Sequence, residues 1–380
     1  MPPSPDAYWL ALRRVRGVGP RTARLLLERF GSAEAIFAAG ETELAAAGIP
    51  RPTARAIHAF DDFAPLEMEL CELPRIGARL VRWPDPDYPL NLKQIADPPP
   101  YFFIRGQFDA ANPRCVAVVG ARAASEVGRR MARRLGFELA AKGYIVASGL
   151  ARGIDAEAHQ GALDAGGQTV ALMGCGIDVI YPPENRKLAE AIIDGHGGLI
   201  SELPVGTPPI AENFPGRNRL IAGLALGVVV VEAAEKSGSL ITARMALEQD
   251  RQVFAVPGSP LTGRSRGSNR LLKDGARLVD CVEDVIDELA PQLDGSAVAA
   301  VKPAPRDDGK GLRTRAPIAA DSEPDEVKMI LNTLQDAEKL HIDSIIENSG
   351  LNARIVLNLL TDLELRGLVT QYPGKLFSLA

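Results

Sequence analysis

The sequence is poor in cysteine, and its few cysteines lie far apart. Among 380 residues there is no CxxC pair and no histidine cluster near a cysteine, which argues against a zinc site or a disulfide framework. The four cysteines are Cys71, Cys115, Cys175 and Cys281. We therefore expect reduced thiols in a cytoplasmic protein that holds no metal and no cofactor.

Long hydrophobic runs are also lacking. The longest uncharged apolar stretch, residues 220–231, is well short of the ~20 residues that span a bilayer. The N-terminus, MPPSPDAYWLALRR, carries prolines and Asp6 where a signal peptide needs an apolar run. These absences predict a soluble protein with no membrane association.

The chain lacks an excess of positive charge. Its formal net charge of −5 does not suggest a general nucleic-acid binder. Salt screens charges over about 8 Å, however, so a local basic cleft can act within a mildly acidic chain. Net charge alone therefore does not decide between partners.

Six short apolar runs alternate with helical segments in the middle of the chain. They read CVAVVG, YIVASG, TVALMG, GLISE, GVVVVEA and QVFAVPG. Continuous apolar runs are typical of strands buried on both faces, and the alternation with helices predicts a parallel sheet. We expect an α/β fold with a Rossmann-like, doubly wound, mostly parallel sheet in a domain covering residues 71–290.

Smaller domains are expected on both sides of this sheet. Residues 1–70 show helical spacing around a Gly-Val-Gly turn, which predicts a small helical domain of the helix-hairpin-helix or SAM-like kind. Residues 291–322 are rich in proline and alanine and predict a linker. Residues 323–380 have the outline of a winged helix. From Pro324 onward this segment has five basic and eight acidic residues, which favours protein interaction or self-association over reading of duplex DNA.

The loops after the predicted strands lack the familiar nucleotide motifs. Neither GxGxxG nor GxxxxGK[ST] occurs, and the first strand is followed by GARAAS. Four loops instead combine arginine or lysine with glycine and small hydroxyl residues, groups that suit phosphate oxygens. Their candidate phosphate-binding residues are Arg122, Ser125, Ser148, Gly149, Arg152, Gly153, Arg217, Asn218, Arg219, Lys236, Ser237, Gly238 and Ser239. Because the carboxyl ends of parallel strands share one edge, we expect these loops to meet in a single crevice.

Asp155 and His159 lie four residues apart and thus on one helix face. They could form a catalytic dyad, but an acid near a helix start is more simply a stabiliser of that helix. We predict that both residues support the site structurally.

The order of these motifs resembles the DNA-processing protein A family, DprA/Smf. The strings are GAR, SGLARGIDAEAH, FPGRNRLIAGLA, KSGSLITA and VFAVPG, and the likeness covers about residues 80–288. The resemblance implies a homodimeric, single-stranded DNA-binding recombination mediator that protects incoming strands and loads RecA recombinase during natural transformation (competence). It also implicates eight positions in phosphate contact: Arg122, Ser148, Gly149, Arg152, Arg217, Asn218, Arg219 and Lys236. Ala121 stands where many members of the family carry serine.

Two alternatives remain open from the sequence. Gly17, Gly19 and Arg21 form either a second DNA contact or a tight interhelical turn. The crevice would also suit a nucleotide-phosphate hydrolase or transferase. KSGSLITARMALE distantly resembles the glycine-rich loop of nucleotide phosphoribohydrolases, with Glu248 as the candidate acid. The absence of an obvious nucleophile, base and acid favours a binding protein over an enzyme.

Overall fold

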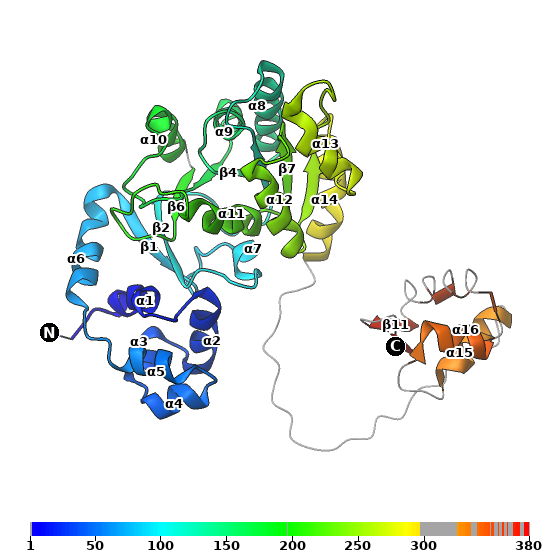
Figure 1. Cartoon of the computed structure of the whole chain (residues 1–380), viewed down its shortest axis with the longest axis horizontal. Coiled ribbons are helices and arrows are strands. Elements are labelled where there is room, and N and C mark those ends of the chain that lie inside the picture. The colour runs from blue at the N-terminus through cyan, green and yellow to red at the C-terminus, as the bar shows by residue number, and fades with distance from the viewer. Residues whose placement is uncertain are drawn as a thin grey trace. The chain divides into compact units, whose positions relative to one another are not determined.

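The structure is a computed structural model, and it divides into two compact units, Met1–Val301 and Lys302–Ala380. Figure 1 shows the whole chain, and each unit is described by itself. The described residues are 2–195, 197–296, 325–335, 340–349, 351–352, 356, 359–360, 363, 368–372 and 376–379.

The first unit begins with a bundle of short helices, blue in Figure 1. These are α1 (Pro5–Arg14), α2 (Pro20–Phe30), α3 (Ala33–Ala38), α4 (Glu41–Ala46), α5 (Arg51–His58) and α6 (Ala64–Glu72). The side chains of Ser4 and Ser32 accept amide hydrogen bonds at the starts of α1 and α3, as helix-capping residues do. Buried leucines of this bundle share one hydrophobic core with Tyr101 and Phe103 of the sheet. The bundle and the sheet are therefore packed together.

The bundle contains two similar helical hairpins. RGVGPRTA joins α1 to α2, and AGIPRPTA joins α4 to α5. Gly17 and Gly48 occupy the same place in the two hairpins, with φ of 88° and 87°, a region that favours glycine. A Cβ on Gly17 would lie 2.4 Å from Thr53 Oγ1, so the two hairpins are in contact. The helix-hairpin-helix prediction is confirmed, and the motif occurs twice.

A nine-stranded sheet follows in the order β1-β2-β6-β5-β4-β3-β7-β8-β9. Strands β3 to β9 pair in parallel, whereas β1 and β2 are antiparallel. The six apolar runs form β3 to β8, which confirms the predicted mostly parallel sheet. The strands are β1 (Ala78–Arg82), β2 (Tyr101–Gly106), β3 (Cys115–Gly120), β4 (Ile145–Ser148), β5 (Thr169–Leu172), β6 (Gly198–Ser201), β7 (Gly227–Val231), β8 (Gln252–Ala255) and β9 (Arg277–Leu278).

Helices cover both faces of the sheet, so its strands are apolar on both sides. In β7, Val228 and Val230 pack into the core beneath α11 and α12, whereas Val229 packs toward α8, α9 and α14. The helices are α7 (Leu90–Lys93), α8 (Glu126–Ala141), α9 (Ile154–Asp164), α10 (Arg186–Asp194), α11 (Asn213–Leu224), α12 (Gly238–Glu248), α13 (Arg266–Lys273) and α14 (Glu283–Ser296), with short 3-10 turns η1 (Pro74–Ile76), η2 (Pro183–Asn185) and η3 (Gly263–Ser265).

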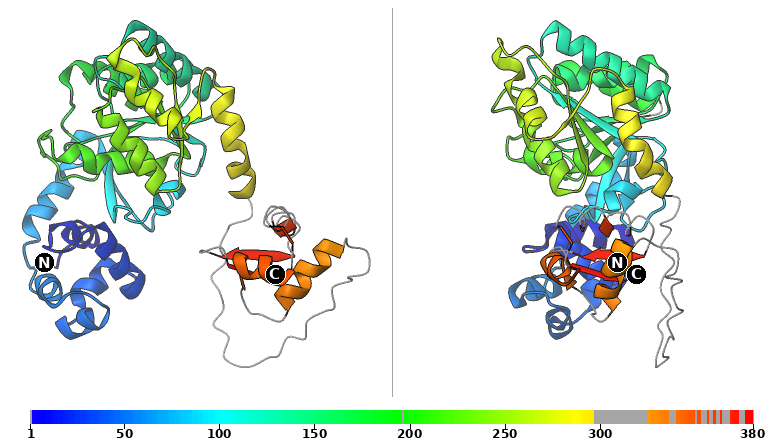
Figure 2. Two further views of the ribbon diagram at one scale, coloured as in Figure 1. Left: turned by 45° about the vertical axis from the view of Figure 1, so that its right-hand side comes forward. Right: turned by 90° about the vertical axis from the view of Figure 1, so that its right-hand side faces the viewer.

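Helix α14, yellow in Figures 1 and 2, continues past Pro291 to Ser296. The first six residues of the predicted linker are therefore helical. The apolar face formed by Val285 and Leu289 continues to Leu293, and its packing against the sheet maintains the helix despite the proline. The rest of the predicted linker, residues 297–322, lies outside the described residues.

The second unit combines α15 (Asp325–Gln335), α16 (Ile342–Ser349) and a small antiparallel sheet. Its strands β10 (Leu340–His341), β11 (Val369–Tyr372) and β12 (Leu376–Leu379) lie in the order β10-β12-β11. Ile330, Ile345 and Phe377 are buried in its core. This is the predicted winged-helix arrangement. Arg354, Asp362, Glu364 and Arg366, which are among the charged residues counted from Pro324 onward, lie outside the described residues.

Candidate functional site

A cavity of about 570 Å³ opens where the carboxyl ends of β3, β4 and β7 meet. Six of the predicted phosphate-binding residues line it: Arg122, Arg217, Asn218, Ser237, Gly238 and Ser239. A small adjoining pocket shares Arg122, Phe214 and Arg217 with it and adds Gly149 and Arg152. The predicted meeting of loops at one edge of the sheet therefore brings these eight residues together.

Arg217 forms the buried floor of this cavity. Its guanidinium donates to the carbonyl oxygens of Gly149, at 2.8 Å, and of Leu172. A Cβ on Gly149 would lie 2.7 Å from the guanidinium nitrogens, so only glycine permits this close approach. Burial lowers the pKa of Arg217 to about 10. Much of its hydrogen-bonding capacity is thus used inside the protein, where it ties α11 to the ends of β4 and β5.

Asp155 and His159 have separate partners. The Asp155 carboxylate accepts hydrogen bonds from the amides of Gly149 and Ala151, at 3.1 and 3.4 Å, and burial raises its pKa against the opposing effect of Arg217. His159 Nδ1 lies 2.6 Å from Thr169 Oγ1, whose own proton goes to the Val146 carbonyl. Nδ1 must therefore donate. Burial lowers the pKa of His159 to about 3, so the imidazole is neutral at neutral pH. The two side chains do not form a catalytic dyad.

Three further predicted phosphate ligands, all outside the cavity lining, also have partners inside the protein. The Ser148 hydroxyl donates to the Val118 carbonyl at 2.6 Å. Arg219 is held by Glu202 at 2.5 Å and by the Asp97 carbonyl at 2.7 Å. Ser125 donates to a carboxylate described below. None of the three lines the cavity.

Gly153 and Lys236 also lie outside the residues that line the cavity. Gly153 has φ of 76°, and a Cβ there would lie 2.4 Å from the Ala121 carbonyl oxygen. It permits the tight turn into α9. Lys236 is exposed, one residue before the lining serine of the same loop.

Glu232 occupies the N-terminus of the first helix after β3, the position at which a Rossmann-like fold often binds a phosphate. Its carboxylate accepts from Ser125 N at 3.0 Å and from Ser125 Oγ at 2.6 Å, at the start of α8. A Cβ on Gly128 would lie 2.1 Å from Glu232 Oε2. Dinucleotide-binding proteins place a pyrophosphate at the corresponding helix terminus. Here the chain supplies its own carboxylate at that helix terminus. The sequence analysis did not identify Glu232, although an acid that ends an all-apolar strand is an unusual signal.

Two aromatic rings border the cavity. Phe214 lies 5.9 Å from Tyr181, measured between ring centroids. The guanidinium carbons of Arg122 and Arg217 lie 5.7 and 5.6 Å from the Phe214 ring. Such a platform suits stacking of a planar base beside cations that attract phosphate. Tyr181 was missed because its loop, after β5, contributes no predicted phosphate ligand.

Comparison with protein-family models identifies the chain. Residues 79–290 match the model of DNA recombination-mediator protein A, and residues 314–375 match the DprA winged helix domain. The chain belongs to the DNA recombination-mediator protein A family. Residues 10–60 of this family member also match a SAM-like helix-hairpin-helix tandem, in agreement with its two hairpins. The resemblance found in the sequence is confirmed.

Known relatives extend over most of this family member. Protein Smf of Synechocystis is 35% identical over 396 residues, which cover 98% of both chains. The X-ray structure of DprA from Streptococcus pneumoniae has a TM-score of 0.64 at 34% identity, covering 74% of this chain and 97% of that one. A second structure, with a TM-score of 0.50 at 29% identity, is described as showing the single-stranded DNA binding mode of DNA processing protein A from Helicobacter pylori. It covers 57% of this chain and 96% of that one.

The first helical hairpin of this family member leaves fewer free cations than its sequence suggests. Arg13 and Arg14 pair with Glu202 at 3.3 Å and Glu69 at 2.6 Å. Arg21, in contrast, is exposed at the start of α2. Gly19 precedes that helix with no side-chain cap and no acid in the first turn, which leaves backbone amides open. This hairpin thus combines open amides with an exposed arginine.

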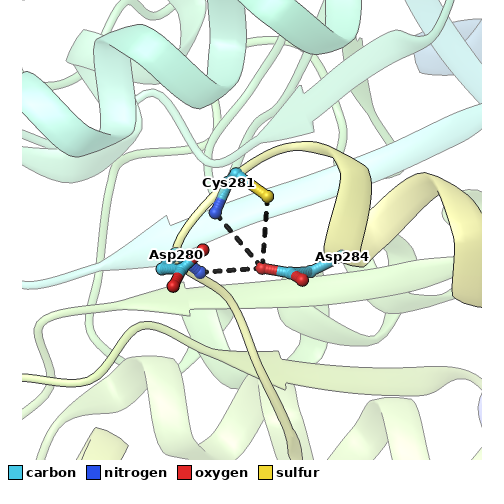
Figure 3. Close-up of side chains that lie close together, drawn as sticks. All are labelled: Asp280, Cys281 and Asp284. Atoms are coloured by element: carbon cyan, nitrogen blue, oxygen red, sulfur yellow. Dashed lines mark hydrogen bonds between the residues drawn. The ribbon is translucent and has the colours of Figure 1, made fainter.

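Asp280, Cys281 and Asp284 gather at the start of α14 and lie close enough to suggest a metal site (Figure 3). One oxygen of Asp284, however, accepts from the amides of Asp280 at 3.0 Å and Cys281 at 3.2 Å, and from the Cys281 thiol at 3.6 Å. These bonds satisfy backbone groups at a helix start. The cluster is explained as a helix cap.

Within the described part of the chain, no helix combines the length and the apolar character needed to cross a bilayer.

Proposed function

We propose that this family member is a single-stranded DNA-binding recombination mediator that acts in the cytoplasm. The observation that carries the proposal is the position of Arg122, an exposed cation beside the Phe214 ring at the mouth of the cavity. A single strand offers both charged phosphates and unstacked bases, and a cation beside an aromatic ring suits both at once. The relationship to the Helicobacter pylori protein supports the same ligand.

In this proposal the strand runs over the α11–α12 side of the crevice. Arg122, Arg152 and Lys236 contact phosphates there, with Arg152 first released from its exposed ion pair with Glu184. Ser237 and Ser239 add hydroxyl groups at the start of α12, whose first turn holds no acid. Phe214 and Tyr181 supply the surface on which bases stack. Arg217 supports this surface from below.

The enzyme alternative is weaker. Glu248, the candidate acid, ends α12 and does not line the cavity. Ten residues of helix separate it from Gly238, a rise of about 15 Å. Asp155 lines the cavity, but its carboxylate already accepts a backbone amide hydrogen bond inside the protein, which is a structural role. We therefore propose binding without catalysis. Release of free base from a mononucleotide would contradict this.

Removing two exposed crevice cations should weaken strand binding strongly. We expect Arg122→Ala/Lys236→Ala to lower the affinity for a single-stranded oligonucleotide at least tenfold, because two phosphates lose their partners. The slope of log K against log salt should become less steep by about 1.4, at ~0.7 per contact. Fluorescence anisotropy across a salt series measures both quantities.

The matched control is Arg134→Ala/Lys142→Ala, which removes two exposed cations away from the cavity lining, one in α8 and one at its C-cap. It should bind like the wild type. Equal losses in the two double variants would mean that only general charge matters. If the wild type hardly binds the oligonucleotide, and a mononucleotide readily displaces what does bind, the hydrolase or transferase alternative is favoured.

We also propose that the protein forms a homodimer and loads RecA onto incoming strands during natural transformation, as the family resemblance implies. Strand β9 supports the dimer, because it is a free sheet edge and its Leu278 is half exposed. Sedimentation of the wild type and of Leu278→Asp tests self-association, and a dimer should shift toward monomer in the variant.

RecA assembly on a single strand, measured with and without this protein, tests the proposed loading. If this protein does not accelerate RecA assembly on the strand, the loading role is rejected.

We propose the first helical hairpin as a second DNA contact through Gly17, Gly19 and Arg21. Because the bundle shares its core with the sheet, deleting residues 1–70 would disturb both parts. The point variant Arg21→Ala is the better test. If Arg21→Ala binds single-stranded and double-stranded DNA with the affinity of the wild type, the hairpin serves only the packing of the helical bundle.

A further inference from the structure

A strip of basic side chains runs along the exposed face of α13. Arg266, Arg270 and Lys273 are spaced four and three residues apart, so they share one helix face and span a rise of about 10 Å. Arg264 precedes them in η3 and is also exposed. We call these four residues the α13 strip. Gly267, Ser268 and Leu271 turn toward the protein, which leaves the charged face to solvent.

Two of the four cations of the α13 strip have an acidic neighbour and two do not. Arg264 lies 3.9 Å from the Glu232 carboxylate, at the outer limit of an ion pair, and its side chain is mostly exposed. Arg266 and Lys273 form no ion pair with any described residue. Arg270 lies 3.5 Å from Asp274, but both side chains are mostly exposed, and such pairs are weak. Asp274 is also the only acid between residues 257 and 277. A local surplus of positive charge of this kind attracts a polyanion even in a chain of net charge −5.

The α13 strip begins beside the crevice loops. Arg264 donates to the Ala123 carbonyl at 3.1 Å, in the loop that carries Arg122. The Gly267 amide donates to the Ala233 carbonyl at 2.7 Å, in the loop that leads to Lys236. The strip therefore begins at the two loops that carry Arg122 and Lys236.

We propose that the α13 strip binds the phosphates of a longer single strand after the strand leaves the crevice. This rests on the proposed function, because the crevice must hold the strand first. Phosphates repeat along the strand, and a row of cations on one helix face can contact several of them. An acidic protein surface is the competing occupant, but the continuity with the crevice loops favours the nucleic acid.

Oligonucleotide length separates the strip from the crevice. We expect Arg266→Ala/Lys273→Ala in the full chain to bind a short oligonucleotide of roughly 6 nucleotides like the wild type, because that length fills the crevice only. Its affinity for a strand of roughly 20 nucleotides should fall about tenfold, and its salt slope should become less steep by about 1.4. Alanine favours helix, so α13 should remain folded. Anisotropy with both lengths gives the result, with Arg134→Ala/Lys142→Ala as the charge-matched control.

Three outcomes would overturn the proposal that the α13 strip binds the strand. One is undiminished binding of the long strand, which would leave the strip to a protein partner. The second is an equal loss for both lengths, which would place these residues in the crevice or in folding. The third is an equal loss in the control variant. If the wild type itself binds neither length, the proposed function fails, and that result is distinct from all three.

Discussion

Replacing Arg217 by alanine should destabilise the protein by about 3–5 kcal/mol, because two buried carbonyls lose their donor at about 1–3 kcal/mol each. The variant leaves the buried carbonyls of Gly149 and Leu172 without their donor. It also removes the cation that favours the ionised form of the buried Asp155. Unpaired buried polar groups are among the few causes of so large a change. Urea denaturation of the wild type and variant measures the difference in unfolding free energy.

Arg122→Ala is the matched control for this prediction. Its guanidinium lies as close to the Phe214 ring as that of Arg217 but is exposed, so its loss should cost less than about 1 kcal/mol. Arg217→Lys should recover only part of the stability. Nη1 donates to both carbonyls while Nε donates to Asn218 Oδ1 at 3.2 Å, and a lysine has no second donor at the position of Nε. If Arg217→Ala unfolds within about 1 kcal/mol of the wild type, the floor of the crevice does not depend on this arginine.

This result would change how binding data on the family's arginine motif are interpreted. Arg217 and Arg219 look like phosphate ligands in the sequence, yet both have partners inside the protein. A loss of DNA affinity in Arg217→Ala would combine a folding defect with any lost contact. Arg122 and Lys236 are the cleaner probes because neither forms an ion pair within the described chain.

The sheet and the meeting of its loops could be predicted because both depend on local patterns. Doubly buried strands are continuous apolar runs, and parallel strands present their carboxyl ends at one edge. The internal partners of individual site residues could not be predicted. Ser125 bonds with Glu232, which lies 107 residues away, and Ser148 bonds with a carbonyl 30 residues away. Such pairs depend on the packed structure. A single sequence can mark one member as unusual, as Glu232 is, but it does not show which residue the partner is.

Acidification should destabilise the protein through His159. The imidazole is completely buried, and burial is the main cause that lowers its pKa from 6.5 to about 3. Its unfolded form therefore binds a proton between these values while the folded form does not. Stability from this group is complete above pH 6.5 and is lost as the pH falls toward 3. The expected loss between neutral pH and pH 5 is about 2 kcal/mol.

His159→Gln isolates this effect, because its amide can still donate to Thr169 but does not titrate. Asp155 acts in the opposite direction, since a raised pKa makes the folded state take up a proton more readily in acid. That contribution is common to both proteins and cancels in the comparison. Urea denaturation at a series of pH values should give a flatter profile for the variant below pH 6.5. Parallel profiles would mean that His159 accepts a proton on Nε2 in the folded protein, and the neutral state of the imidazole would be wrong.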